Sequence, residues 1–142
     1  MDFSNMTKTY IGSLKVGSIF MIDDRPCKIT FYRAGKTGKH GAAKAVIKAT
    51  DLITDKHIET SGSTSSDAWI PKVEKKDFKL LDFDGDFITL MDETSGETLD
   101  IKLNETDEFT PKIIKAFEEK EELIVSMLFV NGEERIIGAK KE

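Results

Sequence analysis

Short apolar or alternating runs, each closed by a turn signal, recur along this chain and limit what it can fold into. Residues 18–22 are mainly apolar and end at the turn-forming residues 23–26, residues 27–33 alternate with period two, and residues 45–52 form a further run. Runs of this length with period-two alternation favour β-strands over helices. The sequence therefore predicts small β-sheets joined by tight turns.

The second half of the chain repeats this pattern and adds hairpin signals. Asp84-Gly85 and Asn131-Gly132 separate strand-like runs, as does Ser95-Gly96. Such dipeptides suit two-residue turns because their backbone tolerates positive φ. The predicted strands are residues 78–83, 87–91, 98–103, 123–130 and 134–137.

One segment reads as a helix. Thr110 is expected to be its N-cap, and Pro111 suits the first helical position, where a backbone N–H is not needed. Ile113, Ile114 and Phe117 then form an apolar stripe. The glutamates of residues 118–122, like the acidic run 105–108, are interpreted as solvated faces.

The order of these elements predicts the fold class. Three strands, a helix and two strands are typical of the OB-fold, and the first half suits a small barrel of the SH3 type. The prediction is a mostly β protein with two small β-barrels in tandem, an SH3-like N-terminal domain and an OB-fold C-terminal domain with one helix. The expected parts are a flexible arm over residues 1–13, the first domain over 14–72, a linker within 71–77, and the second domain over 73–142.

Composition agrees with two small cores. The 142 residues are 39% hydrophobic and 33% charged, which leaves little apolar material for one deep core. Cys27 is the one cysteine, so an internal disulfide and a thiolate metal cluster are excluded, and a buried strand position is expected for it. No apolar run approaches the roughly 18 residues that span a membrane, and there is no signal-peptide pattern. A cytoplasmic protein without membrane partners is expected.

Charge is distributed unevenly. The formal net charge is -5, yet residues 25–50 hold seven basic residues and no acidic one. A locally basic face on an acidic protein points to an anionic partner more strongly than the net charge does.

The stretch 35–44 lies in the middle of this basic region and joins two expected strands. It contains three lysines and three glycines. A P-loop would need glycine at position 30, where this chain has Thr30, and a helix after Thr37. This spacing excludes a nucleotide-binding loop. A solvated hairpin tip and a contact with a polyanion or a modifying enzyme both remain. Arg33, Lys44 and Lys48 flank the turn without a compensating acid, which favours the second interpretation.

Other chemistry finds little support in the sequence. His40 and His57 are the only histidines, and no ligand set surrounds either of them. Cys27 and His40 lack a third partner for nucleophilic catalysis. Phe31, Tyr32 and Trp69 could stack on nucleic-acid bases, but core packing is the favoured expectation for each. Neither a catalytic residue nor a metal site is predicted.

The string Thr37-Gly38-Lys39-His40-Gly41, with Lys36 before it and Lys44 shortly after, resembles the hypusine loop of the translation initiation factor 5A family. This family is the counterpart of bacterial elongation factor P. Residues 25–29 upstream also resemble the family's strand before the loop, and the likeness extends over roughly residues 14–142. The family's eukaryotic loop usually has histidine where this chain has Ala42.

The resemblance implies a non-enzymatic factor that carries hypusine on Lys39. Deoxyhypusine synthase would transfer an aminobutyl group from spermidine to this lysine, deoxyhypusine hydroxylase would hydroxylate it, and no cofactor is implied. The factor would bind the ribosome and ribosomal RNA. Its hypusine would contact the acceptor end of peptidyl-tRNA and so promote peptide bond formation at slow sequences and termination. The residues expected to contact RNA or the ribosome are Arg33, Lys36, Thr37, Gly38, His40, Gly41 and Lys44.

Two alternatives from other classes stay open. One is an unmodified RNA- or single-strand-binding module whose basic hairpin only contacts phosphates. The other is an interaction adaptor that uses the acidic helix.

Overall fold

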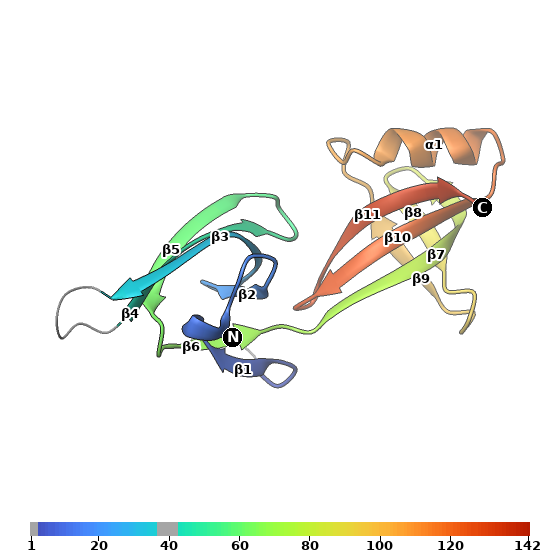
Figure 1. Cartoon of the computed structure of the whole chain (residues 1–142). Coiled ribbons are helices and arrows are strands. Elements are labelled where there is room, and N and C mark those ends of the chain that lie inside the picture. Colours follow the sequence, from blue (N-terminus) through green and yellow to red (C-terminus); the bar gives the residue numbers. More distant parts are fainter. Residues whose placement is uncertain (1–2, 37–42) are drawn as a thin grey trace. The chain divides into compact units, whose positions relative to one another are not determined.

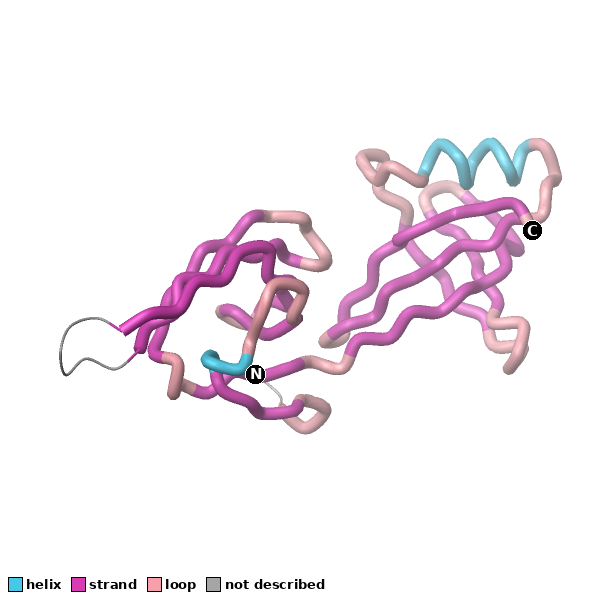
Figure 2. Tube along the Cα trace, viewed as in Figure 1, coloured by secondary structure: helices cyan, strands magenta, loops and turns pink. Residues whose placement is uncertain are grey.

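The computed structural model describes residues 3–36 and 43–142, which are mostly β-strand with one α-helix (Figures 1 and 2). The expected mostly β class is confirmed. The elements are β1 (Thr7–Tyr10), the 3-10 helix η1 (Ile11–Ser13), β2 (Ile19–Ile22), β3 (Arg25–Lys36), β4 (Ala43–Asp51), β5 (His57–Ser63), β6 (Asp67–Ile70), β7 (Val73–Asp84), β8 (Phe87–Met91), β9 (Thr98–Lys102), α1 (Thr110–Glu118), β10 (Leu123–Val130) and β11 (Glu133–Lys141).

The chain divides into two compact units. The first unit is Met1–Val73 with Val130–Glu133, and the second is Glu74–Phe129 with Glu134–Glu142. The main division falls between Val73 and Glu74, next to the predicted boundary of 72/73. Only Pro71 and Lys72 separate β6 from β7, so residues 73–77 of the expected linker already belong to a strand.

The first unit is built on an antiparallel sheet with the order β2-β3-β4-β5. Asp23 and Asp24, with φ of 47° and 64°, form the two-residue turn between β2 and β3. The predicted turn 23–26 is thus shorter than expected, because Arg25 and Pro26 already belong to β3. The core of this unit lies on one face of the sheet and contains Ile11, Leu14, Phe20, Ile22, Cys27, Ile29, Ala45, Ile47, Ala49 and Ala68.

The N-terminal residues differ from the expected arm. From Thr7 onward they form β1, which pairs antiparallel with β6, and η1, whose Ile11 is buried. Backbone hydrogen bonds hold this ribbon, and three of the four β1 side chains are exposed. A strand of this kind has no apolar alternation, so the pattern of residues 1–13 could not reveal it. β5 was not predicted for the same reason, because the Ser/Thr-rich stretch after Asp55 has no apolar alternation.

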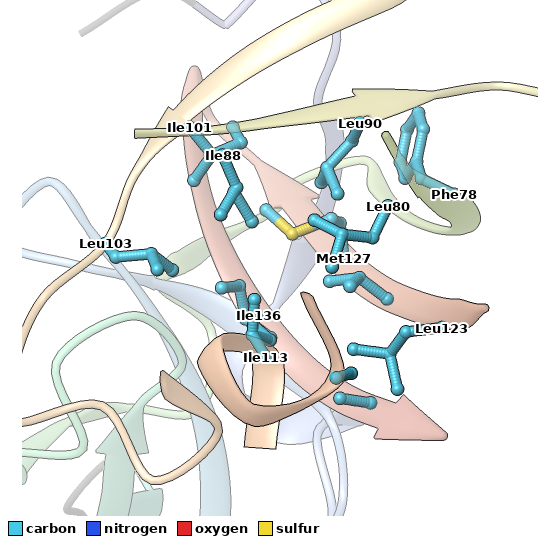
Figure 3. Close-up of a cluster of buried hydrophobic side chains, with 13 residues drawn as sticks. Phe78, Leu80, Ile88, Leu90, Ile101, Leu103, Ile113, Leu123, Met127 and Ile136 are labelled. Atoms are coloured by element: carbon cyan, nitrogen blue, oxygen red, sulfur yellow. The ribbon is translucent and has the colours of Figure 1, made fainter. Parts of the chain in front are cut away.

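The second unit has three strands, a helix and two strands, in the predicted order. Its sheet has the order β11-β10-β7-β8-β9. Ile113 of α1 meets strand side chains such as Leu90 and Met127 in one buried cluster (Figure 3). The apolar stripe predicted for the helix is confirmed by the burial of Ile113 and by the packing of Phe117 against the cluster.

The two small barrels that the sequence predicts are not closed. The described strands form open sheets of two, four and five strands, and β9 and β11 are the edges of the largest sheet. Strand number and turn positions follow from residue patterns. Closure depends on the tilt and stagger of the first strand against the last, which those patterns do not encode.

The start of α1 also differs from the prediction. Phe109, not Thr110, is the N-cap residue, and Pro111 lies in the first turn as expected. The hydroxyl of the buried Thr110 donates to the carbonyl of Asn104 at 2.7 Å. The Asp107 carboxylate accepts the backbone N–H of Phe109 at 2.9 Å and orders the entry to the helix. Within residues 3–36 and 43–142, no helix has the length and apolar character needed to span a bilayer.

Candidate functional site

The β3–β4 hairpin carries the predicted loop. Its last paired residues are Lys36 with Ala43, preceded by Gly35 with Lys44, so both expected flanking strands are confirmed. Six loop residues lie outside the described part of the chain, and so does the side chain of Lys36. The roles expected for Thr37, Gly38, Lys39, His40, Gly41 and Ala42 stay predictions.

The two faces of β4 differ sharply. Ala45, Ile47 and Ala49 are buried in the core, while Lys44, Val46 and Lys48 between them are exposed. This period-two pattern places the basic residues of β4 on one outward face. The strand predicted at residues 45–52 is confirmed as β4.

In β3, a bulge at Thr30 changes which side chains face outward. The pairing with β4 shifts between Ile29 and Phe31, and the Thr30 hydroxyl donates to the carbonyl of Lys48 at 3.2 Å. One extra residue exchanges the two faces of the strand beyond it. Phe31 is therefore 42% exposed, and core packing was the wrong expectation for it.

The other two aromatic residues differ: Tyr32 packs against the core as expected, whereas Trp69 packs against Phe3. Tyr32 points to the core side, where its hydroxyl donates to the carbonyl of Ile11 at 2.9 Å. Trp69 is half-buried, and its ring lies 4.2 Å from that of Phe3.

The outward side chains of β3 and β4 form a mainly basic surface, which we call the outer face. Its residues are Lys28, Phe31, Arg33, Lys44, Val46 and Lys48. On β3 to β5, as far as these strands are described, Glu59 is the only exposed carboxylate; it lies 3.8 Å from the Lys48 ammonium group. The structure thus brings the predicted contact residues Arg33 and Lys44 to one surface. It adds Phe31 and Lys48, which the sequence reasoning had not assigned.

The opposite end of the hairpin is fixed by an ion pair. Arg25 Nε donates to Asp51 Oδ2 at 2.7 Å and Arg25 Nη2 to Oδ1 at 3.2 Å. Asp51 Oδ1 also accepts the backbone N–H groups of Ile53 and Thr54. Burial alone would raise the pKa of Asp51. The hydrogen bonds from Arg25 and the two amides outweigh it and lower the pKa to about 2.

Replacing Asp51 with asparagine should therefore destabilise the first unit by about 2 kcal/mol at pH 7. A carboxylate whose folded pKa lies below its ordinary value of 3.8 contributes stability above that pH. This contribution is lost as the pH falls toward 2, so the difference from wild type should shrink over that window.

Trp69 is the only tryptophan and belongs to the first unit, so its fluorescence during urea unfolding provides the measurement. Asp24→Asn, at an exposed turn position that asparagine tolerates, is the matched control and should change little. An Asp51→Asn variant as stable as wild type at pH 7 would contradict the assigned role.

Cys27 is a core residue, as predicted. It is fully buried, and this burial raises the pKa of its thiol to about 11, so the nucleophilic thiolate does not form near neutral pH. No group of three or more His, Cys, Asp or Glu side chains suited to a metal ion occurs in residues 3–36 and 43–142.

The acidic residues after α1 are solvent-facing, as expected. Glu121 pairs with Lys141 at 3.1 Å and Glu122 with Lys79 at 3.4 Å. Such exposed pairs contribute little to stability because water and salt screen them.

Both units match described protein families. Residues 4–66 match "Translation initiation factor 5A-like, N-terminal", and residues 72–140 match "Eukaryotic elongation factor 5A hypusine, DNA-binding OB fold". The second description agrees with the order of elements in the second unit.

Similar proteins come from distant organisms. The chain is 34% identical to eukaryotic translation initiation factor 5A-2 of Arabidopsis thaliana, over 97% of this chain and 89% of that protein. A solved structure of a translation initiation factor eIF-5A family protein from Naegleria fowleri is 38% identical, with a TM-score of 0.88 over 96% of this chain and 99% of the other. Eukaryotic translation initiation factor 5A from Methanococcus jannaschii is 28% identical, with a TM-score of 0.76 over 99% and 98%.

Proposed function

Because the chain belongs to the translation initiation factor 5A family of translation factors, we propose that it acts on the ribosome through a hypusine on Lys39. The modified side chain contacts the acceptor end of peptidyl-tRNA. This contact promotes peptide bond formation at slow sequences, such as runs of proline, and supports termination. The factor itself performs no bond chemistry.

The β3–β4 hairpin is the observation that carries this proposal. Two strands in continuous register from Phe31 to Lys36 hold the ends of the segment that contains Lys39. A lysine lengthened by an aminobutyl group carries two amines, which can make charge-assisted hydrogen bonds to phosphates. Holding a flexible tRNA end in its reactive geometry accelerates a reaction by orientation alone.

The proposed partners follow from the same hairpin. Ribosomal RNA and peptidyl-tRNA meet Arg33 and Lys44 together with Lys36, Thr37, Gly38, His40 and Gly41. Deoxyhypusine synthase and deoxyhypusine hydroxylase act on Lys39 before the factor works in the cytoplasm. Support comes from the basic outer face, where Arg33 and Lys44 are exposed beside the loop.

The mass of the Lys39 peptide from protein isolated from its native host tests the proposal. We expect a gain equal to an aminobutyl group plus one oxygen on Lys39. The neighbouring Lys44 in the same digest should be unmodified and is the internal control. An unmodified Lys39 would favour an RNA-binding module that acts without hypusine and would end the present proposal.

A further inference from the structure

The outer face of the first unit has an exposed aromatic ring among cations, and the loop chemistry does not use it. We propose that this face binds an unpaired RNA strand, with one base stacked on Phe31 and phosphates held by Arg33, Lys44 and Lys48. The inference rests on the proposed function only in taking RNA as the partner. It adds to the contact already proposed for Arg33 and Lys44 a stacking position on Phe31 and a further cation, Lys48, and this part of the face works without hypusine.

Phe31 is placed for contact, not for packing. The bulge at Thr30 turns it outward, and 42% of its surface is exposed. Val46, which pairs with Arg33 and so lies diagonally across from Phe31 on β4, is 48% exposed. Two neighbouring apolar side chains on a face that is otherwise basic give a base a flat surface on which to stack.

Cations lie on both sides of this ring. Arg33 follows Phe31 on the same face of β3, and residues two apart on a strand are separated by about 7 Å. Lys48 is paired with Phe31 across the sheet, and its ammonium group lies 5.5 Å from the ring centroid. An RNA strand with one base stacked on Phe31 therefore has positive groups within reach of the phosphates next to that base.

The Lys48 ammonium group lies over the Phe31 ring, and its ion pair with Glu59 does not hold it there, so the lysine can move aside when a base stacks on the ring. Lys48 and Glu59 are 54% and 72% exposed, and the 3.8 Å that separates them is a loose, solvated pair. Salt and water screen such pairs, so Lys48 can exchange the carboxylate for a phosphate. Because Glu59 is the only exposed carboxylate described on β3 to β5, a polyanion meets little repulsion there.

The charges and the ring together favour unpaired RNA over the other anionic partners. An acidic protein would satisfy the cations but would not require a flat aromatic surface. A duplex would contact the cations but keeps its bases stacked on one another. Only a single strand uses the ring and the cations together.

Fluorescence anisotropy with a labelled single-stranded RNA decamer tests this, using full-length protein made in bacteria, where Lys39 has no hypusine. Phe31→Ala should weaken binding about tenfold without changing the salt dependence, because the ring contacts a base. Arg33→Gln should lower the slope of log affinity against log salt by about 0.7, the value for one phosphate of a single strand. Phe31→Tyr should restore binding, because it keeps a flat ring.

The second unit offers matched controls. Phe87 is 50% exposed and Lys102 lies beside it on β9, so Phe87→Ala and Lys102→Gln change the same chemistry elsewhere. Neither should alter RNA affinity. Trp69 fluorescence verifies that each first-unit variant is folded.

The outcomes separate this inference from the proposed function. Equal affinity of wild type and Phe31→Ala for the single strand would overturn the inference. So would a Phe31→Ala variant that loses as much affinity for an RNA duplex as for the single strand. Absence of RNA binding by wild type at 50 mM salt would also overturn it and point to an acidic protein partner. An unmodified Lys39 in native protein would overturn only the hypusine proposal and leave the anisotropy result standing.

Discussion

Replacing Lys39 with arginine should abolish the stimulation of proline-run synthesis while both units stay folded. Arginine keeps the positive charge, but its guanidinium cannot accept the aminobutyl group that forms hypusine. The side chain then stays short and loses the second amine. The proposed activity is the orientation of a tRNA end. A side chain too short to contact that end therefore abolishes the stimulation of peptide bond formation instead of weakening it.

The measurement is translation of a proline-run reporter in host cells whose only copy of the factor is the variant. Lys56→Arg is the matched control, since it makes the same change at an exposed lysine of the first unit outside the outer face and should leave reporter output near wild type. Normal output from Lys39→Arg would refute the hypusine mechanism. Circular dichroism of the purified variant should match wild type.

Ile113→Ala should destabilise the second unit by about 3 kcal/mol. Ile113 is fully buried where α1 meets the sheet (Figure 3), so truncation leaves a cavity that the surrounding strands cannot fill. The helix would then lose the contact that holds it on the strands. Since about 1.4 kcal/mol is a factor of ten, the most protected amides should exchange roughly 100-fold faster.

Hydrogen exchange followed by mass spectrometry measures this for peptides from β8 and β10. Ile114→Ala makes the same chemical change one residue along the helix, at a half-buried position, and should cost much less. Equal exchange in the two variants would show that burial of Ile113 does not hold the helix in place. Peptides from β4, in the first unit, should exchange as in wild type.

The sequence predicted most of the fold through local signals that act over a few residues. Asn131-Gly132 forms a turn with positive φ as expected, Asp23-Asp24 lies within the predicted turn 23–26, and Pro111 lies at the start of the helix. The run at residues 45–52 predicted β4. These features depend on residues that are adjacent in the sequence, so the sequence alone predicts them.

The misplaced features depend on backbone geometry between distant segments. Residues 29–32 are all good strand formers, so nothing in their order shows that Thr30 is the extra residue. Without that bulge, Phe31 would face the core. The pairing of β1 with β6 leaves most side chains of β1 in solvent and gives no periodic signal.

The candidate site also combines a feature that the sequence shows directly with one that depends on the fold. Lys39 was identified by a contiguous string, which a sequence displays directly. The outer face needs the register of β3 against β4 to bring Phe31, Arg33 and Lys48 together. Its basic character was foreseen from the composition of residues 25–50, but its aromatic centre was not.

The pairing of β1 with β6 also affects when the first unit can finish folding. Residues 7–10 meet residues 67–70, about 60 positions later, so this contact closes a long loop. The β2–β3 and β3–β4 hairpins are local and can form early in synthesis. The N-terminal strand must wait, unpaired, until residue 70 has left the ribosome. The order of synthesis thus makes β1, the first strand translated, one of the last to be fixed in this unit.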